Sequence, residues 1–329
     1  MEESINAPQS PSKVPQVRVI FMGTPELSVS ILQSLLENNY HVVAAVTKPD
    51  AKSGRKGELA ASPVKQLALA AGVPVLTPEK LTPDFYDELK LLKPDLIVVA
   101  AYGKILPKNI LDLPGLGCLN IHYSLLPRFR GASPIQNALL FGDTVTGVTL
   151  IKMDAGLDTG DIINTQSVTI DPHDTATTLT PKLNLAAIEL TLTTLPLWIE
   201  QEITSTPQPE TGVVLCQLIE RADGKIEWSL DAQTIYNKYR AFDPWPGIFT
   251  YWKKADAFVR IKLLSVSLYT HPIEQNYLLG EVFQLADCIA VQTGTELLIL
   301  HTVQPEGKSS MAISEFIRGN PDFIGGVLV

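Results

Sequence analysis

An asparagine and a histidine, Asn120 and His122, stand at the end of an apolar run that begins at Leu116. The run predicts a buried strand, and alternate side chains of a strand share one face, about 7 Å apart. An amide that can hold an oxyanion would then lie beside an imidazole that can give and take a proton. Ligands of open α/β sheets gather at the carboxyl ends of strands. The pair is therefore typical of acyl-transfer chemistry, although a single strand histidine is more often structural.

An acidic loop, residues 153–161, contains Asp154, Asp158 and Asp161 together with two glycines. Its spacing does not fit an EF-hand, which needs oxygen ligands at positions 1, 3 and 5 and a glutamate at position 12. A solvated turn explains the glycines. Because a histidine often needs an acidic partner, one of the aspartates could also orient His122. The residues alone leave open which aspartate that would be.

Other nucleophiles and cofactor motifs are poorly represented. Ser124 could serve as the serine of a hydrolase, but the chain has no Gly-x-Ser-x-Gly elbow. The turn Gly23–Glu26 stands where a dinucleotide would bind, yet it lacks the glycine-rich fingerprint. Cys118, Cys216 and Cys288 are too scattered for a zinc site. We therefore expect neither a dinucleotide nor a metal.

Two regions carry basic side chains that could meet a nucleic acid. Residues 48–57 form an insertion longer than the usual two to six residues of a βα loop, with Lys48, Lys52, Arg55 and Lys56. This segment is either a solvated loop or a basic arm for a phosphate backbone. Further along, Arg240, Lys253, Lys254, Arg260 and Lys262 stand near Trp245, Tyr251 and Trp252. That mixture suits RNA contact but also an ordinary surface over a few core aromatics.

In the first two thirds of the chain, the spacing of apolar residues predicts alternating strands and helices. Strands are expected at 17–22, 41–46, 73–76, 96–101, 147–153 and 161–170, and helices at 27–36, 62–71, 84–92, 133–141 and 176–199. Alternating strands and helices predict an α/β fold, a parallel sheet with helices on both faces. From residue 213 the pattern changes to short strands, which predicts a small β-barrel or sandwich.

These patterns divide the chain into four segments. Residues 1–16 are expected to be a disordered extension, 17–200 a catalytic domain, 201–212 a linker and 213–329 a C-terminal domain. A formal charge of −9 argues against a generic nucleic-acid coat without excluding a local basic patch. No apolar run approaches the roughly 18 residues that span a bilayer, and no signal peptide is recognisable. We expect a soluble protein of the cytoplasm or of an organelle with equivalent redox state.

Several motifs together resemble the methionyl-tRNA formyltransferase family. They are Phe21–Glu26, Asn120–His122, Ser124–Gly131, Gly147–Thr149, Met153–Asp161, Ala241–Gly247 and Val303–Lys308. The resemblance implies a Rossmann-like, mostly parallel sheet followed by an OB-like β-barrel. It also implies formyl transfer from 10-formyltetrahydrofolate to the α-amine of methionine on initiator tRNA, by a protein that we expect to act as a monomer.

The resemblance also assigns roles to residues. Asn120, His122 and Asp158 correspond to the catalytic triad, in which Asn120 and His122 stabilise the oxyanion and Asp158 orients His122. Ser124, Leu125, Leu126 and Pro127 would lie against the folate. Arg55, with Lys52 and Lys56, would belong to a basic loop that enters the acceptor stem.

Two other functions share some of these features. A formyltransferase for a small amine, such as a ribonucleotide or an amino-sugar nucleotide, has the same triad. A protein that binds folate or RNA without catalysis would share the fold. The basic insertion and the basic second domain favour tRNA, because a small substrate would need neither.

Overall fold

The computed structural model describes residues 17–53, 58–269, 271 and 277–329. The chain divides into two compact units, and each is described by itself. The first comprises the residues up to His122, Val148–Gln166 and Asn184–Pro209, and the second comprises Tyr123–Gly147, Ser167–Leu183 and Glu210–Val329. Within the described ranges, no helix has both the length and the apolar character needed to cross a membrane.

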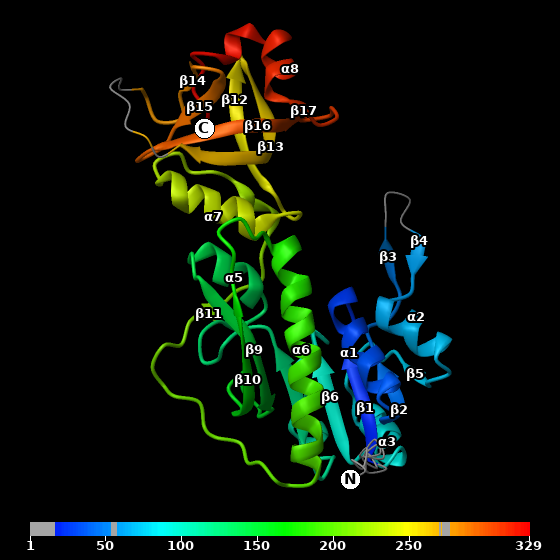
Figure 1. Cartoon of the computed structure of the whole chain (residues 1–329). Helices are drawn as coiled ribbons and strands as arrows, with labels where there is room; N and C mark the ends of the chain where they lie inside the picture. Colours follow the sequence, from blue (N-terminus) through cyan, green and yellow to red (C-terminus); the bar gives the residue numbers. More distant parts are fainter. Residues whose placement is uncertain (1–16, 54–57, 270, 272–276) are drawn as a thin grey trace, which may run out of the picture. The chain divides into compact units, whose positions relative to one another are not determined.

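A seven-stranded sheet forms the centre of the α/β part (Figure 1). Its strands are, in order across the sheet, β10 (Asp161–Thr169), β9 (Val145–Lys152), β7 (Cys118–His122), β6 (Leu96–Ala100), β1 (Arg18–Gly23), β2 (His41–Val46) and β5 (Val75–Leu76). The pairs β7–β6, β6–β1, β1–β2 and β2–β5 are parallel, whereas β7 and β9 are antiparallel. The predicted mostly parallel sheet is therefore confirmed.

Helices cover this sheet on both faces, as predicted. The crossovers through α1 (Glu26–Glu37) and α2 (Pro63–Ala70) step one way along the sheet, and the crossover through α3 (Pro83–Leu91) steps back. Because such crossovers are right-handed, α3 takes the face opposite to α1 and α2. Ile20 and Met22 of β1 accordingly pack in one cluster with Phe85 and Leu89 of α3.

Local signals define where these helices begin. The Ser62 side chain accepts a hydrogen bond from the backbone N–H of Lys65, and Pro63 occupies the first helical position of α2. Thr82 and Pro83 repeat this arrangement at α3. After α3 the chain passes through β6 and α4 (Lys108–Leu111) to the strand that carries Asn120 and His122.

The C-terminal sheet is antiparallel and follows the order β12 (Ile248–Lys254), β13 (Ala257–Tyr269), β16 (Leu297–Pro305), β15 (Cys288–Gln292), β14 (Val282–Leu285). The chain end joins its two edges. Val329 exchanges backbone hydrogen bonds with Tyr251 of β12, while Gly325 and Gly326 bond to Val282 of β14. Sheet and chain end thus approach the predicted barrel. β17 (Met311–Ala312) and α8 (Ile313–Arg318) complete this part.

Several elements were not anticipated from the sequence. The insertion at 48–57 is not simply an irregular loop, because β3 (Ala51–Ser53) and β4 (Glu58–Ala60) pair as a hairpin. Lys52 is exposed on β3, whereas Arg55 and Lys56 lie outside the described residues. Helix α7 (Ala232–Phe242) was also missed, and it packs against α5 (Pro134–Leu140). β8 (Arg130–Gly131) pairs in parallel with β11 (Leu215–Cys216).

Helix α7 also changes the interpretation of one basic residue. Arg240 is only 5% exposed; its guanidinium donates to Asn237 Oδ1 at 2.6 Å and to the carbonyl of Asp174 at 3.4 Å. A side chain held in this way is not available to a nucleic acid. Arg240 is therefore part of the folded core and is removed from the basic surface that the sequence suggested.

Asp174 is buried and forms an ion pair with the half-exposed Lys182 of α6 (Ala176–Ile199), and this pair gives a stability prediction. Burial alone would raise the pKa of Asp174, but hydrogen bonds from Lys182, Asp171 and Thr178 outweigh it and hold the pKa below its usual value. Asp174→Asn should destabilise the protein by about 2 kcal/mol at neutral pH. Since a lowered carboxyl pKa stabilises the fold above the ordinary value of about 3.9, the wild-type advantage should disappear as the pH falls through the lowered pKa. Urea midpoints of both proteins, measured from pH 7 downward, check this; an equal gap at every pH would contradict it.

Candidate functional site

Strand β7 positions Asn120 and His122 at the carboxyl end of the parallel part of the sheet. Asn120 is paired with Val99 of β6 on one side and Ile151 of β9 on the other, and His122 is opposite Thr149. Both side chains point to one face, because strand residues alternate. His122 is the last residue of β7 and its side chain is only 5% exposed, while Asn120 is half-buried.

The loop between β9 and β10 brings Asp158 to this pair. Asn120 Nδ2 donates to Asp158 Oδ1 at 3.3 Å, and His122 Nδ1 lies 3.6 Å from Asp158 Oδ2. Each carboxylate oxygen therefore faces a different partner. The carboxylate is 13% exposed, so little solvent screens its attraction for a protonated imidazole.

The other two aspartates of the loop have different partners. Asp154 Oδ1 accepts from the backbone N–H of Gly156 and from Thr159 Oγ1, which closes the turn on itself. Asp161 accepts from Ser205 Oγ at 3.3 Å. Among the three candidates for the partner of His122, the structure thus brings Asp158 to the pair. Its catalytic role stays a prediction.

Two backbone features define the shape of the Asp158 loop. Asp158 has a φ of 54°, in the left-handed region that aspartate tolerates better than most residues. A Cβ on Gly160 would lie 2.0 Å from the carbonyl oxygen of Lys152, so the loop passes too close to β9 for any side chain there. The backbone thus fixes the direction from which the carboxylate approaches.

Gln208 makes a contact to the Asp158 loop that the sequence did not reveal. Its Nε2 donates to the carbonyl oxygens of Asp158 and Gly160, at 2.8 and 2.7 Å. Gln208 falls in the segment 201–212, whose polar and proline-rich composition predicts only a linker. A contact between residues about 50 positions apart leaves no local signal, and periodicity could not have found it.

The segment predicted to contact folate belongs to the second unit. Ser124 is fully buried and its Oγ donates to the carbonyl of Arg128 at 2.6 Å; Leu126 is buried, and the Leu126–Pro127 peptide is cis. Leu125 and Pro127 are half-buried. Ser124 is thus engaged in closing its own turn.

Beyond this turn, the chain is held by charge and by strand pairing. The Arg128 guanidinium forms a two-pronged ion pair with Asp143, both contacts 2.8 Å long, and stacks on Phe129. A Cβ on Gly131 would lie 2.2 Å from the carbonyl oxygen of Cys216, where β8 meets β11. These contacts order the 124–131 turn from its far end.

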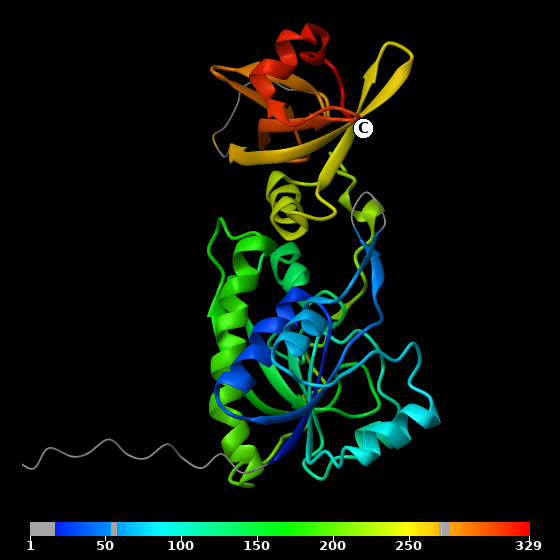
Figure 2. The ribbon, with the colours of Figure 1, turned by 90° about the vertical axis from the view of Figure 1, so that its right-hand side faces the viewer.

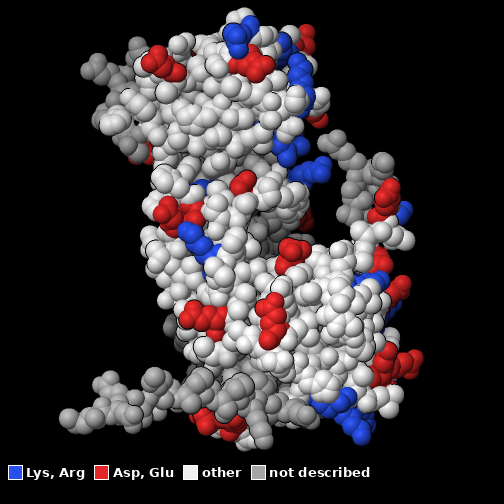
Figure 3. All heavy atoms as spheres, turned by 45° about the vertical axis from the view of Figure 1, so that its right-hand side comes forward, with Lys and Arg blue, Asp and Glu red and all other residues white. Residues whose placement is uncertain are grey.

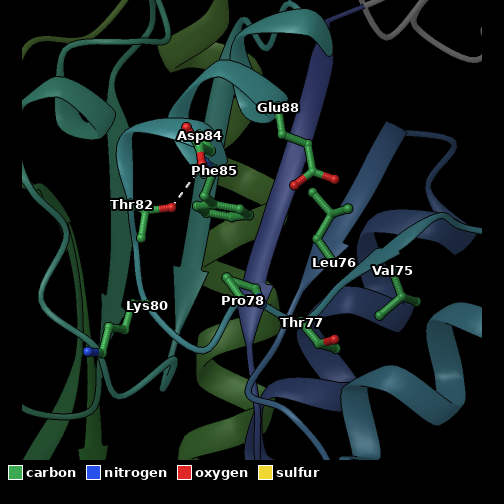
Figure 4. A pocket seen from close by; sticks show the side chains of 9 residues that line it. All are labelled: Val75, Leu76, Thr77, Pro78, Lys80, Thr82, Asp84, Phe85 and Glu88. Carbon is green, nitrogen blue, oxygen red and sulfur yellow. Dashed lines mark hydrogen bonds between the residues drawn. The ribbon is translucent and has the colours of Figure 1, made fainter.

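A pocket of about 480 Å³ lies elsewhere in the first unit (Figure 4). Leu76 and Phe85 form apolar parts of its lining, with Lys80, Asp84 and Glu88 around them. None of the residues to which the sequence assigned chemistry lines it. The part of the chain that the structure describes also contains no group of three or more His, Cys, Asp or Glu side chains placed to hold a metal ion.

Comparison with known proteins gives matches along most of the chain. Residues 16–195 match the family described as formyl transferase, and residues 218–321 match its C-terminal domain. A methionyl-tRNA formyltransferase of Myxococcus xanthus is 44% identical over 308 residues, covering 92% of this chain and 95% of the relative. That of Geobacillus thermodenitrificans is 42% identical over 309 residues, with coverages of 92% and 93%.

Solved structures share the fold. An N-formyltransferase from Helicobacter canadensis, in complex with folinic acid and dTDP-3-aminofucose, superposes with a TM-score of 0.64 at 19% identity, over 86% of this chain and 98% of that one. HypX from Aquifex aeolicus, in complex with tetrahydrofolic acid, gives 0.59 at 18% identity, over 95% of this chain and 48% of that one. At these identities the likeness concerns the fold alone.

Proposed function

Since the chain belongs to the methionyl-tRNA formyltransferase family, we propose that it transfers a formyl group from 10-formyltetrahydrofolate to the α-amine of methionine on initiator tRNA. The structural observation that carries the proposal is the grouping of Asn120 and His122 around the Asp158 carboxylate. Its setting, the end of a parallel strand, is where α/β folds place their ligands.

The chemistry follows from these three side chains. The methionine amine attacks the formyl carbon, a C–N bond forms, and negative charge develops on the formyl oxygen. Asn120 and protonated His122 donate to that oxygen, and one such donor is worth roughly 3–4 kcal/mol in comparable sites. The bond from the formyl carbon to the folate nitrogen then breaks.

Two proton movements complete the transfer. The attacking amine must lose a proton, which Asp158 accepts directly or through water. The departing folate nitrogen must gain one, which His122 supplies. Asp158 has a second task, because its carboxylate, 3.6 Å from Nδ1, orients the imidazole. Every proton is thus accounted for by this chain's own residues.

We further propose that Ser124–Pro127 contacts the folate and that Lys52, Arg55 and Lys56 contact the tRNA. Lys52 is exposed on β3, with its side chain opposite Leu59 of β4, and the segment bearing Arg55 and Lys56 connects the two strands. The exposed position of Lys52, the described cation of this hairpin, supports a role in binding. That the protein acts as a monomer, in the cytoplasm or in an organelle, stays a prediction.

The decisive experiment is formyl transfer from 10-formyltetrahydrofolate, with three acceptors compared. Methionyl initiator tRNA should be formylated, and uncharged tRNA and a small amine such as an amino-sugar nucleotide should not. Formylation of the small amine alone would retain the triad chemistry but overturn the tRNA substrate. Loss of all turnover, with folate still bound, would favour a binding protein.

Arg55→Ala should raise the KM for methionyl-tRNA by about ten-fold and leave folate binding unchanged, because the change removes one phosphate contact. Steady-state kinetics with each substrate varied in turn measure both effects. Glu58→Ala, which alters charge at the same hairpin in the opposite sense, is the matched control and should not raise this KM. A weaker affinity for folate in the Arg55 variant would move Arg55 to the donor site instead.

A further inference from the structure

The polar segment that follows α6 is bonded to the start of β10, beside the loop that joins β9 to β10. Ile162 and Thr206 exchange two backbone hydrogen bonds, each 2.8 Å long. Ser205 Oγ donates to Asp161 Oδ2 at 3.3 Å. Figure 1 and Figure 2 show this part of the chain as an extended trace that leaves the end of α6. We call residues 205–208 the strap, because they tie this loop to the chain beyond α6.

Gln208 extends the strap onto the Asp158 loop itself. Its Nε2 donates to the carbonyl oxygens of Asp158 and Gly160, at 2.8 and 2.7 Å. An amide NH2 group has two N–H bonds, so one side chain can satisfy both carbonyls. Gln208 is half-buried, which limits the competition from water for these bonds. The strap therefore reaches the residue that carries the carboxylate as well as its neighbours.

The peptide group that Gln208 holds belongs to a residue with an uncommon backbone conformation. Asp158 has a φ of 54°, a left-handed value that few residues other than glycine adopt. Such conformations persist where the surrounding structure maintains them. The carbonyl carbon of Asp158 and its Cβ are attached to the same Cα, so a rotation about φ moves both. By fixing the carbonyl, Gln208 restricts the direction in which the carboxylate points.

The contacts of the carboxylate itself are long. Asp158 Oδ1 accepts from Asn120 Nδ2 at 3.3 Å, and Oδ2 lies 3.6 Å from His122 Nδ1. Strong charge-assisted hydrogen bonds are shorter, at about 2.7–2.9 Å, so these two contacts hold the carboxylate only weakly. Because a misplacement of about 1 Å can lower a rate about 10²-fold, the position of the carboxylate must be maintained by the loop that carries it.

The strap leaves a helix that is itself fixed to the sheet. Trp198, near the end of α6, donates from Nε1 to the carbonyl of Leu116 at 2.9 Å, just before β7 begins. Asn164 of β10 donates to Thr194 Oγ1 of α6 at 3.0 Å. The end of α6 is thus bonded to the chain beside β7 and to β10, which gives the strap a fixed point from which to hold the loop.

We propose that Gln208 is a positioning residue for formyl transfer, and this proposal rests on the proposed function. It holds the Asp158 loop so that the carboxylate faces Asn120 and His122, and it makes no bond to the reacting atoms. Gln208→Met keeps the length of the side chain but removes both donors, so kcat should fall about 10- to 100-fold. The KM values of both substrates should stay within about three-fold of wild type, because Asp158 acts in the chemical step.

Two choices keep other effects out of this comparison. Ser205→Ala is the matched control, because it removes the strap's bond to Asp161 and none of those to Asp158; it should keep kcat within about two-fold of wild type. Gln208→Met changes no charge. Charged side chains of both signs are spread over the face in Figure 3, and the chain carries a formal net charge of −9. An added carboxylate, as in Gln208→Glu, would therefore alter the general repulsion of an anionic substrate.

A double-mutant cycle separates positioning from stability. If Gln208 acts through the Asp158 carboxylate, Gln208→Met should lower kcat by less than about two-fold when Asp158→Asn is already present. Its effect on the urea midpoint should be equal in both backgrounds, because the loop carbonyls are unchanged. The ¹⁵N NMR shifts of the His122 ring should move in the direction in which Asp158→Asn moves them. A purely structural role predicts wild-type kcat for the folded variant and unaltered ring shifts.

The outcomes distinguish this proposal from the proposed function. Full kcat and unaltered ring shifts in folded Gln208→Met would overturn the positioning role alone, as would an equal fractional loss of kcat with and without the Asp158 carboxylate. If Gln208→Met proves unfolded by circular dichroism, Gln208→Asn, whose donors fall one methylene short of the carbonyls, should show the loss instead; wild-type kcat there would overturn the proposal. Absence of formyl transfer by the wild type with every acceptor would overturn the proposed function, while the ring shifts, which need no turnover, would still test Gln208.

Discussion

Replacing His122 with alanine should lower kcat for formyl transfer by at least about 10³-fold. The imidazole has two proposed tasks, donation to the developing oxyanion and proton delivery to the folate nitrogen, and alanine performs neither. Asn120→Ala removes only the first task and should cost about 10²–10³-fold. Single-turnover kinetics with both substrates saturating would measure the chemical step and exclude effects on product release.

Controls are needed because His122 is buried. Its removal leaves a cavity and takes one partner from Asp158, so thermal unfolding must show that the variant is folded under the assay conditions. His41→Ala is the matched control, since His41 is exposed and begins β2, at the amino ends of the parallel strands. It should retain wild-type kcat. A folded His122→Ala protein working at full rate would refute the proposed triad.

Local signals were sufficient for much of the α/β part of the fold. Helix 176–199 and strand 41–46 were predicted with the bounds that α6 and β2 have, because both are long or strongly apolar. Ser62 and Pro63 marked the start of α2 to within one residue. Asn120 and His122 were found because a strand imposes a period of two residues, so that their shared face follows from their spacing alone.

Features that depend on contacts between residues far apart in the sequence could not be predicted from local signals. The pairing of β7 with β9 runs antiparallel, and the spacing of apolar residues carries no information on strand direction. The three loop aspartates are equivalent by composition, and only the path of the loop over β9 brings Asp158 to His122. Arg240 looked like a surface cation until α7 placed it on Asn237, since local composition cannot show burial.

Asp158→Asn should lower kcat by about 10³-fold while leaving the loop in place. Asparagine tolerates the left-handed backbone of this position, where φ is 54°, and Gln208 donates to backbone carbonyls of the loop that the substitution leaves unchanged, so the fold should persist. The amide cannot stabilise an imidazolium, accept the amine's proton or hold a single imidazole tautomer. In a comparable histidine–carboxylate pair the loss is about 10⁴-fold, so a loss of this order of magnitude is expected here.

Asp154→Asn is the matched control for Asp158→Asn, because it makes the same chemical change in the same loop. Asparagine Oδ1 can still accept from Gly156 and Thr159, so this variant should keep kcat within a few-fold of wild type. The ¹⁵N NMR shifts of the His122 ring add a readout that activity alone does not supply: its two nitrogens should change on Asp158→Asn and not on Asp154→Asn. Equal losses from both variants, with unaltered ring shifts, would mean that the loop's shape and not the Asp158 carboxylate supports the reaction.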